Sequence, residues 1–345
     1  MTRFLTGAAA LAMSVAFTQA AFADAHGGYT IGVSNTVQGN GWREEMICAM
    51  RAQALVEGDV TGLIVAHRNT DSAGQLEDLN NLIEAGVDAI VLNPSGPDAL
   101  NSALETAMEQ GIVVVAVDAG VTAEGAYILS NNQEEYAYLG ARWLFEQIGG
   151  AGDVVYMRGI AGVSADTDRD NGFQRALEEF PNVNVIHEVF TGWQQDQGKQ
   201  QMFDFLATGI PFDGVWTSGI DNVIVDAFVE SGAPLVPIVG ADNAGFVSQL
   251  LEVDGLAGAA VTNPGSVGGA GIALAVDILN GNAPEDTTVL VDPVLWENTT
   301  GQGRATIEAA QNPDLDPEWP VSTTIPGWTD YTLEQIIACD GPGEG

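Results

Sequence analysis

Aromatic, guanidinium and carboxylate side chains recur directly after the apolar segments of this sequence that we expect to form strands. They are Trp42, Arg43, Asp118, Arg169, Trp193, Asp221 and Asp242. An indole can cover the apolar C–H face of a sugar ring. Carboxylates and guanidiniums form charge-assisted hydrogen bonds to hydroxyl groups, so a site built from them rejects analogues that lack one hydroxyl. One Trp alone could pack in a core, and one Asp alone could be solvated, but their joint placement at strand ends favours a site for a polyhydroxylated ligand.

The residues that most enzyme families need are absent or wrongly spaced. Histidine occurs only as His26, His67 and His187, so neither a zinc triad nor an H-E-x-x-H motif is available. Residues 162–166 fail the G-x-S-x-G pattern at the last position, and no phosphate-binding loop or G-x-G-x-x-G motif occurs. Spacing of carboxylates proves nothing in a chain with 47 acidic residues. We therefore expect a binding protein with no catalytic residue, cofactor or metal.

The charge balance excludes several classes of partner. The 345 residues include 47 acidic and 10 basic side chains, which gives a formal net charge of −37. Binding to nucleic acid or to an anionic membrane surface depends on Lys and Arg, so neither is expected. Charged residues are 17% and hydrophobic residues 46% of the chain, which indicates a globular protein with an acidic surface. Salt screens such self-repulsion, so the composition favours a saline habitat.

The N-terminus has the pattern of a secretory signal peptide. Arg3 supplies one positive charge, residues 4–20 are almost entirely apolar or small, and residues 21–23 form an A-x-A cleavage site. We expect residues 1–23 to be removed by cleavage near Ala23, with Ala25 as a second possibility. A membrane anchor is the alternative, although the apolar run is short for a spanning helix and no cationic stop follows it.

The sequence contains two cysteines, Cys48 and Cys339. In an oxidising compartment such a pair is a disulfide candidate. The alternative is two buried thiols.

Apolar β-rich segments alternate with helical patterns along the mature chain. Repeated strand–helix units imply parallel sheets with right-handed crossovers and helices on both faces. The predicted strands fall into two series, at 29–34, 61–66, 89–93, 113–117 and 127–130, then at 153–157, 183–189, 214–217, 236–240 and 258–262. Helices are predicted from Pro97 to Glu109 and over 168–179, among others. The predicted fold is α/β with two doubly wound Rossmann-like lobes, which adjoin through short strands near Asn131 and Thr262. Ligands of such sheets bind at the carboxyl ends of the strands.

The sequence resembles the periplasmic sugar-binding proteins of ATP-driven importers, the ribose-binding-protein-like family. Six stretches carry the resemblance, in the family's order: IGVSNTVQGNGWREEM (31–46), AGVDAIVLNPSGPDAL (85–100), IVVVAVDAG (112–120), GIAGVSADTDRDNGF (159–173), VGADNAGF (239–246) and VTNPGSVGGAG (261–271). The resemblance implies the type I periplasmic binding protein fold, with two lobes joined by a multi-strand hinge. It also implies lobe boundaries: 28–131 plus 263–290 for the first lobe, and 132–262 plus about 291–300 for the second. The chain runs past the family's usual end, and we expect 301–345 to pack back on the first lobe.

The resemblance also assigns binding roles. The residues matched to the family's ligand contacts are Asn40, Trp42, Asp118, Arg169, Trp193, Asp242 and Thr262, the last at the hinge position. The Gly41-Trp42-Arg43 triplet is similar to the galactofuranose-binding branch, which adds Arg43 to the set. Two positions depart from the pattern. Ala119 stands where the family often has Arg, and Asp221 lies in a shifted register after Trp216, so its assignment is the weakest.

The implied function is capture of a small neutral sugar, a pentose or hexose and possibly a furanose, in the cleft between the lobes, for delivery to an ABC permease in the inner membrane. The protein is expected to be a periplasmic monomer. The same fold could instead present its ligand to a chemoreceptor or sensor kinase, or carry a polyol or a furanose-like autoinducer. A sugar-responsive gene regulator is a further alternative, against which the export signal and the lack of a basic DNA-binding head both argue.

Overall fold

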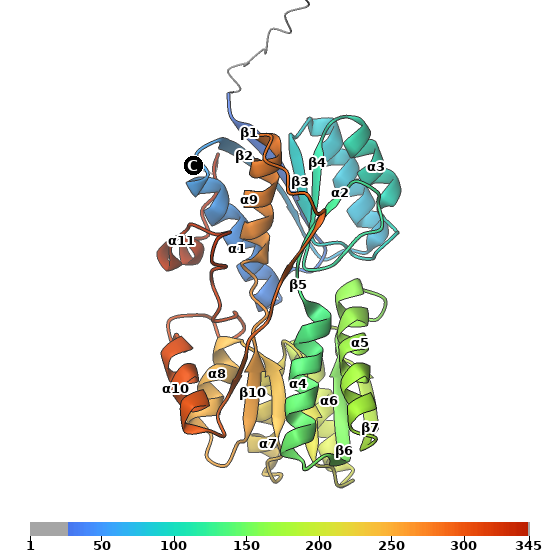
Figure 1. Ribbon diagram of the computed structural model, residues 1–345, viewed down its shortest axis with the longest axis vertical. Coiled ribbons are helices and arrows are strands. Elements are labelled where there is room, and N and C mark those ends of the chain that lie inside the picture. The colour runs from blue at the N-terminus through green and yellow to red at the C-terminus, as the bar shows by residue number, and fades with distance from the viewer. Residues whose placement is uncertain (1–26, 344–345) are drawn as a thin grey trace, which may run out of the picture.

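The computed structural model describes residues 27–343, which form two lobes stacked along the long axis of the molecule (Figure 1). The predicted signal peptide and both candidate cleavage sites lie outside these residues. The first lobe contains an all-parallel sheet in the order β11-β5-β4-β3-β1-β2. Its strands are β1 (Tyr29–Asn35), β2 (Val60–His67), β3 (Ala89–Leu92), β4 (Val113–Val117), β5 (Tyr127–Asn131) and β11 (Thr288–Val291). Its helices are α1 (Gly41–Val56), α2 (Ser72–Ala85), α3 (Asn101–Glu109) and α9 (Val267–Leu279).

The second lobe repeats this plan with the order β12-β10-β9-β8-β6-β7, in which only the edge strand β12 runs antiparallel, to β10. Its strands are β6 (Ala151–Arg158), β7 (Asn182–Phe190), β8 (Gly214–Trp216), β9 (Ile238–Ala241), β10 (Gly258–Val261) and β12 (Leu295–Glu297). Its helices are α4 (Gln133–Gln147), α5 (Ser164–Glu179), α6 (Gln195–Ala207), α7 (Asp221–Ser231), α8 (Ala244–Glu252) and α10 (Gly301–Ala310). The predicted fold class of two doubly wound α/β lobes is therefore confirmed.

The central strands consist of runs of β-branched and small residues, which can be buried on both faces of a sheet. In β4 the side chains of Val114, Val115 and Val117 are at most 1% exposed, as expected for a strand covered by helices on both sides. Helix α9 approaches α1 closely because of its glycines. A Cβ on Gly268 would lie 2.7 Å from Met46, and one on Gly269 would lie 2.9 Å from the Ala49 carbonyl oxygen. A larger residue at either position would push the two helices apart.

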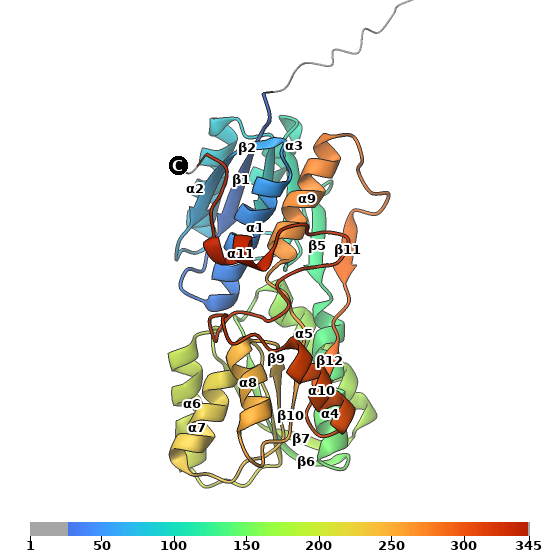
Figure 2. The same cartoon turned by 90° about the vertical axis from the view of Figure 1, so that its left-hand side faces the viewer.

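The chain passes between the lobes after β5, after β10 and after β11, and these strand ends form a multi-strand hinge (Figures 1 and 2). Asn131 closes β5 and Thr262 follows β10, near the points where the sequence predicted the lobes to adjoin. Loops at the carboxyl ends of both sheets face each other beside this hinge, and they carry the candidate site.

Two predicted helices start elsewhere than expected. Helix α3 begins at Asn101 and not at Pro97, because the Pro97 carbonyl accepts from Thr122 N at 2.7 Å and belongs to a turn. Helix α5 begins at Ser164, before the predicted start at 168. Its first turn is fixed because buried Asp166 accepts from Gly159 N at 2.8 Å.

The C-terminal segment differs from the expectation that all of 301–345 packs on the first lobe. Helix α10 packs on α8 of the second lobe, because Ile307 is fully buried in that lobe's core. The chain then crosses to the first lobe, where α11 (Leu333–Ala338) lies against α1 (Figure 2). The prediction is thus wrong for residues 301–310.

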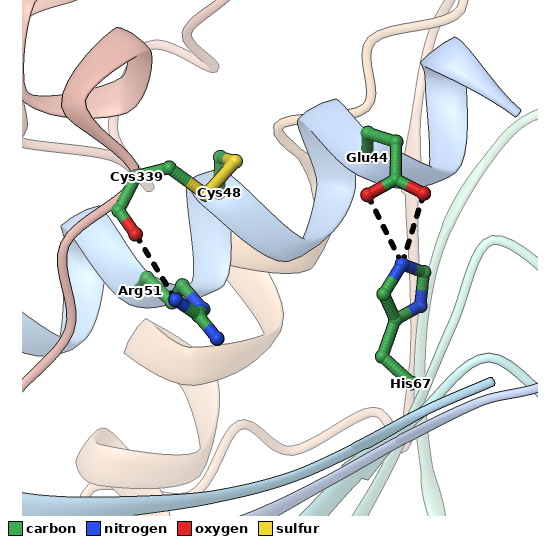
Figure 3. The surroundings of a disulfide bond; sticks show 5 residues. All are labelled: Glu44, Cys48, Arg51, His67 and Cys339. Carbon is green, nitrogen blue, oxygen red and sulfur yellow. Dashed lines mark hydrogen bonds and ion pairs between the residues drawn. A yellow bond between two sulfur atoms is a disulfide. The ribbon is translucent and has the colours of Figure 1, made fainter. Parts of the chain in front are cut away.

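A disulfide joins Cys48 on α1 to Cys339 at the end of α11, as the sequence predicted (Figure 3). Arg51 donates from Nη1 to the Cys339 carbonyl oxygen at 3.2 Å. His67, which Figure 3 also shows, pairs with Glu44 at 3.0 Å. In the chain-entropy account, a disulfide between cysteines 291 residues apart stabilises by about 5–6 kcal/mol. Within residues 27–343, no helix combines the length and the apolar character that spanning a lipid bilayer requires.

Candidate functional site

A cleft between the lobes collects most of the predicted site residues. The space between its lining atoms, opening to solvent included, is about 450 Å³. The lining side chains and backbone come from Val37, Asn40, Trp42, Arg43, Asp118, Ile160, Arg169, Gly192, Trp193, Ser218, Gly219 and Asn263. The cleft therefore brings together six of the nine residues predicted to bind ligand.

The first turn of α1 forms one wall. Asn40 is the N-cap of this helix and accepts from Arg43 N at 3.2 Å. Its amide nitrogen donates across the cleft to the Trp193 carbonyl oxygen at 2.9 Å, which ties the two lobes together. Trp42, next on the helix, donates from Nε1 to the Asn263 carbonyl oxygen at 2.6 Å. This hydrogen bond fixes the orientation of the indole.

Arg43 lies on the same turn, almost completely buried at 5% exposure. Its Nη1 donates to Asn35 Oδ1 at 2.7 Å, a neutral partner. Burial lowers the pKa of Arg43, while the Asp118 carboxylate raises it and the Arg169 guanidinium lowers it. The guanidinium remains charged at neutral pH, because an arginine pKa lies far above it.

Asp118 follows β4 and presents its carboxylate to the cleft. Its Oδ2 accepts from Asn93 Nδ2 at 3.2 Å, and its Oδ1 accepts from Gln133 Nε2 at 2.8 Å. Its backbone has φ 65°, in the left-handed region that non-glycine residues rarely adopt. Ser130 Oγ donates to its carbonyl oxygen at 2.6 Å and helps to hold this conformation. Strained backbone of this kind is often found at ligand sites.

The second lobe supplies the opposite wall. The Arg169 guanidinium on α5 lies over the Tyr136 ring, 4.6 Å from its centroid, and 5.4 Å from the Trp193 ring centroid. Trp193 also has a positive φ, 54°, and its indole covers Gly159 so closely that a Cβ there would lie 2.1 Å from the ring. Only glycine at position 159 allows this placement of Trp193.

Asn263 links the two walls. With its amide oxygen turned towards the donors around it, that oxygen accepts from Arg169 Nη2 at 3.2 Å and from Trp42 Nε1 at 3.1 Å. A guanidinium nitrogen only donates, so this orientation gives Arg169 Nη2 an acceptor, whereas the single indole hydrogen of Trp42 is shared with the Asn263 carbonyl oxygen. Asn263 thus connects the first-lobe indole to the second-lobe guanidinium.

The structure does not place Asp221, Asp242 and Thr262 among the residues that line the cleft in the described part of the chain. Asp242 is fully buried and accepts from Asn263 N at 2.8 Å and from Ser322 N at 3.3 Å. Thr262 Oγ1 accepts from Val294 N at 2.8 Å within the hinge. These side chains hold backbone in place behind the cleft, and their direct contact with ligand stays a prediction.

Asp221 is also fully buried, with three donors on one oxygen. Its Oδ2 accepts from Gly219 N at 3.0 Å, from Ala241 N at 2.9 Å and from Asn243 Nδ2 at 2.7 Å. Burial raises the pKa of Asp221 to about 7, although the backbone donors partly oppose the rise. Asp221 thus joins the ends of two neighbouring strands and shapes the Ser218–Gly219 loop, which does line the cleft.

Several amides that build the site were not predicted from the sequence. They are Asn35, Asn93, Gln133 and Asn263, all at most 5% exposed. Each one ends or follows a strand, so the rule that selected the charged residues applies to them too. Carboxamides carry no charge and are frequent in turns, which is why the composition of the loops did not single them out.

A contact from the C-terminal segment was also missed. Glu318 accepts from Gly41 N at 3.1 Å, at the start of the helix that carries Asn40 and Trp42. A Cβ on Gly41 would lie 2.2 Å from the Glu318 Cβ, so glycine at this position permits the approach. The segment beyond α10 thus braces the first-lobe wall of the cleft.

Paired α/β lobes with a cleft between them beside a multi-strand connection define the class of two-lobed binding proteins. Within that class, residues 31–283 match the family described as periplasmic binding protein domain, and the chain belongs to this family. The resemblance predicted from the six sequence stretches is confirmed. Residues 284–345, including α10 and α11, lie beyond the match.

Named relatives are of moderate identity. A xylitol-binding protein of Mycolicibacterium smegmatis is 27% identical over 236 residues, which make up 67% of this chain and 67% of the relative. A ribose import binding protein of Bacillus subtilis is 22% identical over 262 residues, 75% of this chain and 84% of the relative. The crystal structure of an ABC transporter solute binding protein from Thermobispora bispora superposes with a TM-score of 0.75 at 24% identity, covering 90% of this chain and 94% of that one. This superposition shows the shared fold.

Proposed function

We propose that this protein captures a monosaccharide or a small polyol in the interlobe cleft, as the substrate-binding component of an ABC importer. The observation that carries the proposal is the cleft itself, where two indoles, two guanidiniums and one carboxylate converge from both lobes. Indoles suit the C–H faces of a sugar, and the charged groups suit its hydroxyls. The relatives named for xylitol and ribose support the same ligand class.

Closure of the lobes provides the mechanism. Trp42 lies on the first lobe and Trp193 on the second, so a ligand touches both only when the cleft is shut. A ligand stabilises the closed form by its differential affinity for the two forms. The bond from Asn40 to the Trp193 carbonyl oxygen would break on opening, which gives the closed form a contact of its own. A dissociation constant near 1 μM corresponds to about −8 kcal/mol.

The closed form would be the one that the permease in the inner membrane recognises. Membership of the periplasmic binding protein family implies a periplasmic location. Export would use the N-terminal signal, with cleavage near Ala23 or Ala25, and the mature protein would act as a monomer without a cofactor. Bound sugar would be released unchanged, as expected for a member of a family of binding proteins.

Ligand binding can be tested by thermal shift against a panel that includes ribose, arabinose, galactose, xylitol and myo-inositol, followed by isothermal titration with the best ligand. Ligand binding raises the melting temperature by mass action. Arg169→Ala should weaken binding about 100-fold, because it removes charge-assisted bonds worth about 1.5–3 kcal/mol each. The matched control is Arg142→Ala on the exposed face of α4, which should bind like the wild type.

The same panel can contradict the proposal. The proposal fails if no sugar or polyol raises the melting temperature, or if Arg169→Ala binds the best ligand as tightly as the control does. Recovery of a chemically altered sugar after incubation would show that the protein is an enzyme.

A further inference from the structure

Gln133 occupies a special place in the chain. It is the first residue of α4, two residues after the end of β5, where the chain passes from the first lobe to the second. Its side chain is 3% exposed. A buried amide at a hinge needs partners for both its oxygen and its nitrogen, since unpaired buried polar atoms destabilise the fold.

Its two charged partners come from opposite lobes, and its amide nitrogen also lies 3.3 Å from the Asn263 side-chain amide. The amide oxygen accepts from Arg169 Nε at 2.8 Å, on the second lobe. The amide nitrogen donates to Asp118 Oδ1 at 2.8 Å, on the first lobe. A guanidinium only donates and a carboxylate only accepts, so the orientation of the amide is fixed by chemistry. A neutral group with both functions is what this position requires.

Asp118 and Arg169 both line the cleft, whereas Gln133 is not among the described residues that line it. Over residues 27–343, no ion pair joins Arg169 to a carboxylate. The amide lies between the two charged groups, so the guanidinium does not form a salt bridge that would saturate both. Arg169 Nη1, which no described hydrogen bond uses, and the remaining lone pairs of Asp118 therefore stay available to a ligand.

We propose that Gln133 is a positioning residue for ligand binding. It keeps the Asp118 carboxylate and the Arg169 guanidinium apart and fixes their orientation when the cleft is shut. This inference rests on the proposed function, namely that the cleft binds a sugar or a polyol. Side chains that are already held in place raise affinity, because less conformational entropy is lost when the ligand binds.

Gln133→Glu tests the inference through pH. A protonated carboxyl group can still donate to Asp118 and accept from Arg169, whereas an ionised one repels Asp118. Affinity of the variant for the best ligand of the panel, relative to the wild type at the same pH, should be within about threefold at pH 5 and more than tenfold weaker at pH 8. Gln133→Leu, which lacks both bonds, should be weaker at both pH values.

Gln249→Glu is the matched control. Gln249 on α8 also donates to an aspartate, Asp226, at 2.8 Å, but it lies away from the cleft. Its variant should bind ligand like the wild type at both pH values. A Gln133→Glu variant whose relative affinity is the same at pH 5 and pH 8 would overturn the inference, since a purely structural role creates no such pH dependence.

A ligand-free measurement separates this inference from the proposed function. The bond from Gln133 to Asp118 joins the lobes, so small-angle scattering of ligand-free Gln133→Glu should show a larger radius of gyration at pH 8 than at pH 5, unlike the wild type and the control. If the wild type binds nothing in the panel, the proposed function fails, and the scattering result decides only the part of the inference that concerns the contact of Gln133 between the lobes. An unchanged radius then overturns it.

Discussion

The aspartates at the carboxyl ends of the two sheets differ in whether they line the cleft. On the first lobe, Asp118 after β4 takes a left-handed backbone conformation and presents its carboxylate to the cleft. On the second lobe, Asp221 and Asp242 follow β8 and β9 but are fully buried, with oxygens that accept from backbone N–H groups. Position at a strand end therefore brings an aspartate near the site, and local donors decide whether it faces ligand or holds a loop.

The largest effect on binding is expected at Asp118. Asp118→Asn removes the charge and turns an amide nitrogen towards a donor, either Gln133 Nε2 or Asn93 Nδ2. We expect affinity for the best ligand to fall about 100-fold or more, or about 2.7 kcal/mol. Isothermal titration measures it, with Asp226→Asn on the surface of α7 as the control. Unchanged affinity would show that Asp118 contributes no more to ligand binding than the buried aspartates of the second lobe.

Asp242→Asn should have a smaller effect, on stability instead of binding. The new amide nitrogen would face either Asn263 N or Ser322 N, and one buried donor would lose its acceptor. The expected loss in the free energy of unfolding is about 1–3 kcal/mol, with affinity within about threefold of the wild type. Urea unfolding and titration together test this. A hundredfold loss of affinity without loss of stability would show that Asp242 contacts the ligand after all.

Asp221→Asn should change the free energy of unfolding least at any single pH. One Asp221 oxygen accepts from all three donors, and the other has no partner among the described residues, so the amide oxygen of the variant can keep all three bonds. The difference in stability between this variant and the wild type should depend on pH. Burial raises the pKa of Asp221 to about 7 in the folded protein, above about 3.9 in an unfolded chain. The stability due to its protonation is therefore complete below pH 4 and lost as pH rises through 7.

Urea unfolding between pH 4 and pH 8 measures the difference between the wild type and Asp221→Asn. Relative to the variant, the wild type should lose stability as the pH rises across this window and then level off. A difference that stays constant with pH would mean that Asp221 is ionised throughout, as an aspartate open to the cleft would be.

The strand–helix alternation predicted most of the fold, because central strands such as 113–117 have a pattern that only a doubly covered parallel sheet satisfies. Helix starts were less certain. Pro97 has the right residue type for a helix start, but its carbonyl is bound by Thr122 from another loop. The path of the C-terminal segment was also partly mispredicted, since one buried side chain, Ile307, attaches α10 to the second lobe.

For the candidate site, the sequence predicted six residues that the structure gathers at the cleft: the aromatic and charged residues Trp42, Arg43, Asp118, Arg169 and Trp193, and the amide Asn40 from the family resemblance. It did not distinguish them from Asp242 and Thr262, and it overlooked Gln133. The distinction depends on which backbone N–H groups lie within hydrogen-bond distance. Those groups belong to segments far away in the chain, such as Ser322 for Asp242 and Val294 for Thr262.

The amino-acid sequence alone predicted the class of the molecule: periodicity predicted the two α/β lobes, residue types at strand ends predicted a polyhydroxylated ligand, and the cysteine pair indicated the disulfide. Tertiary structure alone decided the direction in which each polar side chain faces. Burial and periodicity are local properties of a segment, but a buried polar group turns towards whichever partner satisfies its hydrogen bonds. For Asp118, Asp242 and Gln133 those partners are brought close only by the folded hinge.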